Sequence, residues 1–144
     1  MRKDKYILDR FKKAQEKDYK RALDEIKSGR KRTHWMWYIF PQLAGLGSSD
    51  ISNYYGIGSI AEARAYVKDP VLGPRLTEIT LELLLLKTYD PVEILGPIDA
   101  EKLRSCMTLF EIADPDSKKY TWILDKYFEG QRDQKTIVIL EKQR

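Results

Sequence analysis

The chain has 144 residues, a length typical of one domain with an ordinary hydrophobic core, so we expect a single domain over residues 1–144. Hydrophobic residues make up 42% and charged residues 33%, a balance that excludes a disordered chain, and no apolar run reaches the roughly 20 residues of a membrane span. One cysteine and one histidine exclude an internal disulfide and a zinc site built from the usual Cys and His ligands.

The net charge of +4 is too small and too dispersed to indicate a nucleic-acid partner. We therefore expect no metal, no cofactor, no membrane partner and no nucleic-acid partner, although a magnesium ion held by carboxylates alone stays open. The start of the chain is charged and lacks the apolar segment of a signal peptide, which favours a cytoplasmic protein.

Helical periodicity runs along most of the chain and predicts an all-α fold, a single multihelical domain of about six to eight helices. The first amphipathic segment covers about residues 6–27 and ends at Ser28-Gly29, where glycine tolerates the left-handed conformation that follows a helix. Gln15 interrupts the apolar stripe of this segment, so we expect a bend near residues 15–18.

Residues 29–42 follow and read GRKRTHWMWYIFPQ, the densest combination of cations and aromatic rings in the chain. Thr33 is expected to cap a short helix, which Pro41 must end at or before Phe40. A glycine-rich stretch then predicts a loop with one helical turn near residues 49–54. A loop of this length in a small domain commonly has a function.

The remaining helices are marked by capping residues and by proline. They are predicted at 60–68 after the capping box of Ser59 and Glu62, at about 74–87 after Pro74, in a short turn after Asp90-Pro91, at 100–113 after Asp99, at 117–129, and at 133–142 after Asp133. The segment 74–87 is apolar on nearly all sides, so we expect it in the middle of the core. The β-branched run 136–139 also fits a strand, but one without an obvious partner.

The cations Arg30, Lys31 and Arg32 beside Trp35 and Trp37 are the combination that binds a phosphate and stacks a planar ring. The alternative is a solvated basic turn followed by aromatic side chains that pack in the core, as most aromatic residues of small domains do. Both interpretations stay open from the sequence.

The helical periodicity of residues 29–42 also divides their side chains between two faces. Trp35 and Phe40 cannot face the same way as Trp37 and Tyr38, so one part belongs to the core and another part to a site. We expect His34, Trp37 and Gln42 in the functional part. His34 is the one histidine of the chain, and histidine is the usual residue for general acid or base catalysis, although a lone histidine is more often a structural hydrogen-bonding group.

A second candidate lies on the predicted helix 100–113. Lys102, Ser105 and Cys106 are three and four residues apart and share one helix surface, and a lysine beside a serine or cysteine can form an activated nucleophile. The alternative is an exposed lysine beside two small residues that allow helices to pack closely.

Three groups of motifs together resemble the bacterial family called domain of unknown function 1810. They are KRTHWMWYIFPQ at 31–42 with GLGS at 45–48, EARAY at 62–66 with LGPRL at 72–76, and DAEKLRS at 99–105 with MTLF at 107–110. The resemblance covers nearly the whole chain and implies a mostly helical, single-domain, cytosolic protein without an established activity. The sequence departs from the family pattern at Cys106, where relatives would carry serine. This difference weakens the hypothesis that a nucleophile lies at this position.

The resemblance also implies one functional surface. Its members would be His34, Trp35, Trp37, Gln42, Tyr55, Lys102, Ser105 and Thr108.

The leading functional hypothesis is a binding module for a nucleotide or another phosphorylated small molecule. The contacts would come from the cations Lys31 and Arg32, the rings of Trp35, Trp37 and Tyr55, and the polar side chains of Gln42 and Ser105. A second hypothesis is a small hydrolase or transferase acting on a nucleotide-derived metabolite, with catalytic His34 assisted by Asp99 or Glu62. A third is a scaffold whose Trp-rich patch binds a protein partner. Whether the protein is an enzyme stays open.

Overall fold

The computed structural model describes residues 7–143, and within them the chain forms nine helices and no strand, which confirms the all-α class. The helices are α1 (Asp9–Lys27), α2 (Met36–Ile39), α3 (Asp50–Tyr55), α4 (Ile60–Lys68), α5 (Leu72–Leu85), α6 (Pro91–Leu95), α7 (Pro97–Ala113), α8 (Lys119–Phe128) and α9 (Gln134–Lys142). The predicted count of six to eight is slightly too low, because α2, α3 and α6 are complete helices of only 4, 6 and 5 residues.

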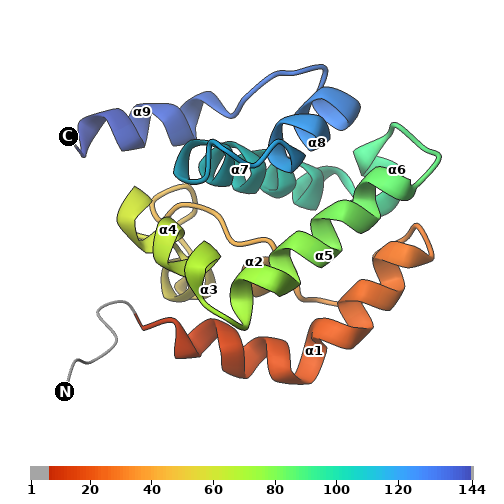
Figure 1. Cartoon of the computed structure of the whole chain (residues 1–144), viewed down its shortest axis with the longest axis horizontal. Coiled ribbons are helices and arrows are strands. Elements are labelled where there is room, and N and C mark those ends of the chain that lie inside the picture. Colours follow the sequence, from red (N-terminus) through yellow and green to blue (C-terminus); the bar gives the residue numbers. More distant parts are fainter. Residues whose placement is uncertain (1–6, 144) are drawn as a thin grey trace.

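The helices are arranged with α1 along one side, α5 across the middle, and α7 with α8 and α9 along the other side (Figure 1). The most buried helix is α7, which packs against α4, α6, α8 and α9. The 74–87 segment is predicted in the middle of the core, and α5 does cross the middle of the molecule, but it leaves Leu81 and Leu85 exposed on its outer side (Figure 1). Its inner side packs against α1, α4 and α8.

The first helix, α1, is unbroken over Asp9–Lys27, and its axis changes direction part-way along its length (Figure 1), in agreement with a bend inside this helix. Gln15 is buried on the inner face of α1, where its amide Nε2 donates to the carbonyl oxygen of Tyr38 at 2.7 Å and to the hydroxyl of Tyr66 at 2.9 Å. A buried polar group that finds such partners costs little, so the helix passes through it unbroken. The run 136–139 is helical within α9, and the strand alternative is therefore wrong.

Two capping predictions fail because the side chains have other partners. Thr33 does not cap α2, whose N-cap is Trp35, since the Thr33 hydroxyl donates to the Glu25 carboxylate. Asp99 does not cap α7, because that helix begins two residues earlier at Pro97; Asp99 lies in its first turn.

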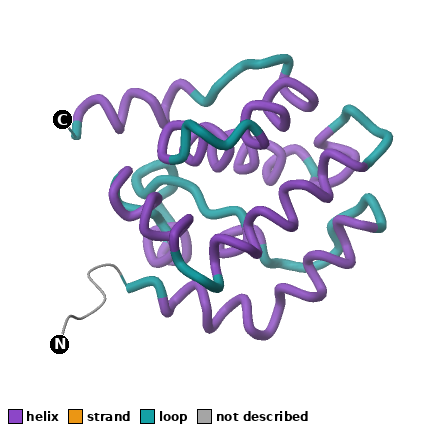
Figure 2. The backbone as a smooth tube through the Cα atoms, viewed as in Figure 1, coloured by secondary structure: helices purple, strands orange, loops and turns teal. Residues whose placement is uncertain are grey.

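The long loop after α2 is interrupted by α3 (Figure 2). Its two ends are tied together by an isolated parallel bridge between Leu43 and Ile57, in which Ala44 N donates to Ile57 O at 2.7 Å and Ile57 N donates to Gln42 O at 3.0 Å. Both bridge residues are buried, so the ends of the loop are fixed in the core while its middle lies at the surface.

Candidate functional site

The geometry of residues 29–42 is fixed by one buried carboxylate, that of Glu25 on α1. It accepts hydrogen bonds from Arg32 N at 2.7 Å, Thr33 N at 3.1 Å, Thr33 Oγ1 at 2.7 Å and the Trp35 indole Nε1 at 2.9 Å. Burial raises the pKa of Glu25, but the hydrogen bonds from Arg32, Thr33 and Trp35 outweigh burial and lower the pKa to about 2. The carboxylate therefore stays charged and holds this segment against α1.

The same carboxylate places Trp35 in the core. The Trp35 side chain is 1% exposed, its ring centroid lies 6.3 Å from that of Phe40, and its one polar atom is bonded to Glu25. A ligand ring cannot stack on a side chain so enclosed. Trp35 thus belongs to the part of the segment that packs, as does Phe40.

The cations Lys31 and Arg32 lie on opposite sides of the chain. Lys31 N donates to Ile94 O at 2.7 Å, whereas Arg32 N donates to Glu25, so consecutive backbone groups point in opposite directions. The Lys31 ammonium accordingly lies 3.0 Å from the Asp99 carboxylate on α7, and the Arg32 guanidinium donates to Ser28 Oγ beside α1 at 3.2 Å. A single phosphate held by both side chains is excluded by this geometry.

A pocket of about 360 Å³ brings together several of the predicted residues, and we call it the Trp37 pocket. It is lined by Trp37, Gln42, Leu46, Gly47, Ile98, Glu101, Lys102, Ser105, Asp133 and Lys135. These residues come from α2, the loop that follows it, α7, and the start of α9. Segments up to about one hundred residues apart in the chain thus meet in one concavity.

The electrostatics of the pocket centre on Lys102. Its ammonium lies 3.9 Å from the centroid of the Trp37 ring and 3.1 Å from Asp99 Oδ1, while the other oxygen of Asp99 binds Lys31. The negative face of an indole ring attracts such a cation. Asp99 therefore holds two ammonium groups, one of them over the accessible tryptophan of the segment.

Two polar side chains in the pocket have hydrogen-bonding capacity left for a ligand. The Gln42 amide makes no hydrogen bond with any side chain or backbone group of residues 7–143. The Ser105 hydroxyl donates to the carbonyl oxygen of Glu101 at 3.1 Å and keeps its lone pairs as acceptors. An amide, a hydroxyl, an ammonium and an aromatic ring therefore converge on one small volume.

Six of the ten predicted site residues lie outside this pocket, including Lys31 and Trp35, whose positions are given above. His34 is exposed and does not line it, and Arg32 lies beside α1. Tyr55 packs against Phe11 and Tyr38 with ring centroids 5.9 Å and 5.1 Å apart. Thr108 is fully buried; it accepts a hydrogen bond from Asp133 N at 2.9 Å and so positions the start of α9 behind the pocket.

The geometry does not support a nucleophile on α7. Cys106 is fully buried, and burial raises the pKa of its thiol well above the ordinary value. The Ser105 hydroxyl proton goes to a main-chain carbonyl, so no base activates it. The predicted acid Glu62 lies elsewhere, bound to Arg10 at 2.8 Å and to the backbone N of Gly58 at 2.8 Å.

Sequence reasoning missed six lining residues of the Trp37 pocket. Ile98 and Glu101 could have been found, because they lie four residues before Lys102 and Ser105, respectively, and so extend the same helix surface. Leu46 and Gly47 lie in a loop, while Asp133 and Lys135 come from α9. Only the tertiary packing of α9 on α7 brings these two charges to the pocket.

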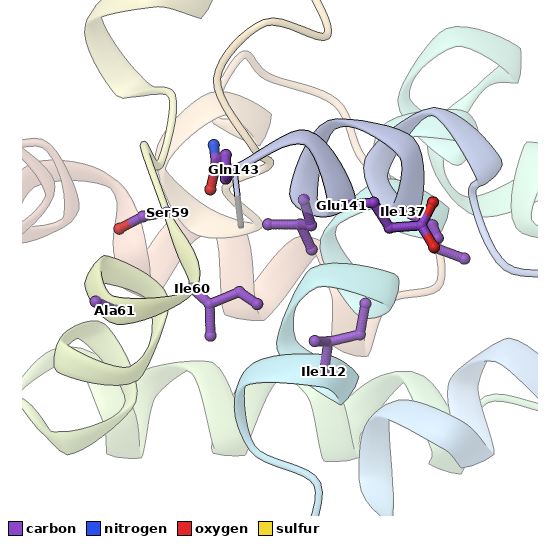
Figure 3. Close-up of a pocket in the computed structure, with 8 residues that line it drawn as sticks. Ser59, Ile60, Ala61, Ile112, Ile137, Glu141 and Gln143 are labelled. Atoms are coloured by element: carbon purple, nitrogen blue, oxygen red, sulfur yellow. The ribbon is translucent and has the colours of Figure 1, made fainter.

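A second cavity of about 400 Å³ lies between α4, α7 and α9, where Ile60, Ile112 and Ile137 converge (Figure 3). Its rim is closed by a hydrogen bond of 2.9 Å from Gln143 Nε2 to Gly58 O. Its lining, drawn from residues 7–143, holds no cation, so an anionic ligand has nothing to pair with there. The Trp37 pocket is the better candidate for the polar ligand that the sequence indicates.

Within the described part of the chain, no three His, Cys, Asp or Glu side chains are grouped so that they could hold a metal ion. No helix formed by residues 7–143 is long and apolar enough to cross a membrane.

Comparison with known proteins places the chain among relatives without an assigned activity. Residues 5–140 match the family model described as protein of unknown function (DUF1810). The fold is similar to the crystal structure of the conserved hypothetical protein Rv1873 from Mycobacterium tuberculosis, with a TM-score of 0.94, 43% sequence identity, and coverage of 96% of this chain and 99% of that chain. A search of the curated proteins gave no significant match.

Proposed function

This chain belongs to the DUF1810 family, as its motifs predicted, and because that family is one of unknown function we propose a function from the geometry of the Trp37 pocket. The protein binds a small ligand that carries a planar ring and one anionic group, such as a nucleotide. The observation that carries the proposal is the convergence of the Trp37 ring, the Lys102 ammonium, the Gln42 amide and the Ser105 hydroxyl in one open concavity. Its volume of about 360 Å³ suits a mononucleotide better than a dinucleotide, since pockets for drug-sized ligands span roughly 300–1,000 Å³.

The charges of the pocket favour a single anionic group. Its two carboxylates are engaged, because Glu101 pairs with Arg104 at 3.0 Å and Asp133 accepts a hydrogen bond from Thr136 N at 3.0 Å at the start of α9. The cations that can meet an anion are Lys102, which already pairs with Asp99 at 3.1 Å, and Lys135, which forms no ion pair with any charged group of the described chain. The ligand ring would take the place of the Lys102 ammonium over Trp37, and that ammonium would turn to the phosphate.

The other two hypotheses receive less support. A hydrolase or transferase that uses His34 needs this imidazole beside the ligand, and His34 lies outside the pocket lining. A protein scaffold needs an exposed Trp-rich patch, whereas Trp35 is buried and Trp37 lines a concavity. We keep the cytoplasm of a bacterium as the proposed location, which a free buried thiol at Cys106 suits.

Calorimetric titration with AMP, ADP-ribose and NAD tests the proposal. We expect saturable binding of at least one of these ligands, and a loss of affinity of at least tenfold in Trp37→Ala and in Lys102→Met. Trp122→Phe is the matched control, because Trp122 is 54% exposed on α8 and lines none of the pockets described above. The proposal fails if none of the three ligands saturates the protein, or if Trp37→Ala binds as tightly as the wild type.

A further inference from the structure

The side chain of Arg32, which the Trp37 pocket does not use, lines a groove on the other side of the 29–42 segment. This groove has a volume of about 430 Å³ and shares no lining residue with the Trp37 pocket. Its lining consists of Lys17, Lys20, Arg21, Asp24, Glu25, Ser28 and Arg32, and we call it the Arg32 groove. We propose that the Arg32 groove binds a short chain of phosphate groups.

The cations gather there because of helical spacing. Lys17, Arg21, Asp24 and Ser28 are separated by four, three and four residues, so they form one face of α1 and the turn that ends it. Arg32 closes the groove from the opposite wall, because its guanidinium donates to Ser28 Oγ at 3.2 Å. The Ser28 hydroxyl in turn donates to the carbonyl oxygen of Glu25 at 2.7 Å, which fixes the acceptor that positions Arg32.

The carboxylates near the groove offset only part of its positive charge, because its lining holds four cations and two carboxylates. Both oxygens of Glu25 are taken up by the four hydrogen bonds that hold Arg32, Thr33 and Trp35. Asp24 is exposed and lies 4.0 Å from the Lys20 ammonium, a surface pair of little strength.

Arg21 is partly neutralised by a hydrogen bond to Asp18, a residue outside the lining. Lys17 forms no ion pair with any carboxylate of the described chain. Lys17, Lys20 and Arg32 are therefore the cations left for a ligand, against the weakly paired carboxylate of Asp24 and the hydrogen-bonded carboxylate of Glu25. The Trp37 pocket, by contrast, holds two cations and two carboxylates.

The dimensions and composition of the groove define the class of anion. Along α1 the backbones of Lys17 and Ser28 lie roughly 16 Å apart at a rise of 1.5 Å per residue, so the cations are spread along the groove and not gathered around one point. Several linked phosphates can meet more of these long cationic side chains at once than a single phosphate can. No aromatic side chain lines the groove, so a base or another ring would find nothing to stack on. The groove therefore recognises the phosphate chain itself, free or at the end of a nucleoside triphosphate.

Calorimetric titration of the full chain with sodium tripolyphosphate at low salt tests this assignment. We expect saturable binding that weakens steeply with added sodium chloride and at least tenfold weaker binding of orthophosphate. In the Trp37→Ala protein, which removes the ring of the other pocket, the affinity for ATP should lie within threefold of that for tripolyphosphate. If orthophosphate bound as tightly as tripolyphosphate, or a short thymidine oligonucleotide bound more tightly, the phosphate chain would not be the ligand.

Charge-removing variants distinguish binding in the Arg32 groove from a general effect of the net charge of the protein on affinity. We expect a loss of at least tenfold in Arg32→Gln and in the double variant Lys17→Gln with Lys20→Gln, and partial recovery in Arg32→Lys. Lys68→Gln, on the exposed face of α4, removes the same charge as Arg32→Gln and should change the affinity less than twofold. An equal loss in Lys68→Gln would overturn the site.

Thermal unfolding identifies any variant that fails to fold, and Arg32→Lys keeps the test decisive if Arg32→Gln is one of them. The Trp37→Ala protein should bind tripolyphosphate like the wild type, so the two proposals can fail independently.

Discussion

Replacing Glu25 by glutamine should destabilise the protein more than any change at an exposed carboxylate. The folded-state pKa of about 2 lies well below the ordinary value of 4.5, so the charged form is stabilised by folding. At 1.36 kcal/mol per pKa unit, this difference corresponds to about 3 kcal/mol of folding free energy at pH 7. Because the folded pKa is depressed, this stability is present above pH 4.5 and is lost as the pH falls toward 2.

Urea unfolding at pH 7 and at pH 3 measures both parts of this prediction. Glu25→Gln should be less stable than the wild type by about 3 kcal/mol at pH 7, with a Tm lower by roughly 6–12 °C. At pH 3 the gap should narrow to about 1 kcal/mol, since the wild type has by then lost most of the contribution of the charge.

Glu16→Gln is the matched control, because Glu16 is an exposed carboxylate of the same helix, and its stability should stay within about 0.5 kcal/mol of the wild type. The reasoning is refuted if Glu25→Gln is as stable as Glu16→Gln at pH 7, or if its deficit is the same at both pH values.

Three further changes test contacts between neighbouring helices and segments of the fold. A Cβ at Gly73 would lie 2.1 Å from the carbonyl oxygen of Val67, so Gly73→Ala should lower the free energy of unfolding by about 2–3 kcal/mol in a urea titration. Lys126 donates to the terminal carbonyls of α5, at 3.0 Å to that of Leu84, so Lys126→Met should lower Tm by several degrees, equivalent to about 1–2 kcal/mol. Thr108→Val removes the acceptor of the Asp133 N–H and should speed amide hydrogen exchange at the start of α9; unchanged exchange there would contradict the role of Thr108.

The helical content was predictable because its signals are local. The capping box of Ser59 and Glu62 marked α4 at its observed start, Ile60, and Ser59 Oγ accepts from Glu62 N at 3.1 Å as expected. Glycine and proline marked most of the other boundaries. The short helices α2, α3 and α6 were predicted as a short helix or single turns, and the total of six to eight was too low because segments of 4–6 residues present too few turns to be counted as full helices from a periodic pattern.

The division of residues 29–42 was predicted in principle and only partly in detail. Helical spacing required Trp35 and Trp37 to face different ways, and they do, with Trp35 in the core and Trp37 in a pocket. The carboxylate of Glu25, ten residues before Trp35, decides which tryptophan is buried, because it accepts a hydrogen bond from the Trp35 indole. This hydrogen bond could not be predicted from the sequence, since nothing distinguishes Glu25 from the other charged residues of α1.

The sequence by itself determined the class of this protein, a single all-helical domain of the DUF1810 family, because helix periodicity, caps and family motifs are properties of neighbouring residues. Only the tertiary structure decided that Lys31 and Arg32 point to opposite sides, that Asp133 and Lys135 join Trp37 and Lys102, and that His34 stays apart. The physical reason is that a pocket is built from side chains that are distant in sequence, and their meeting depends on how the helices pack.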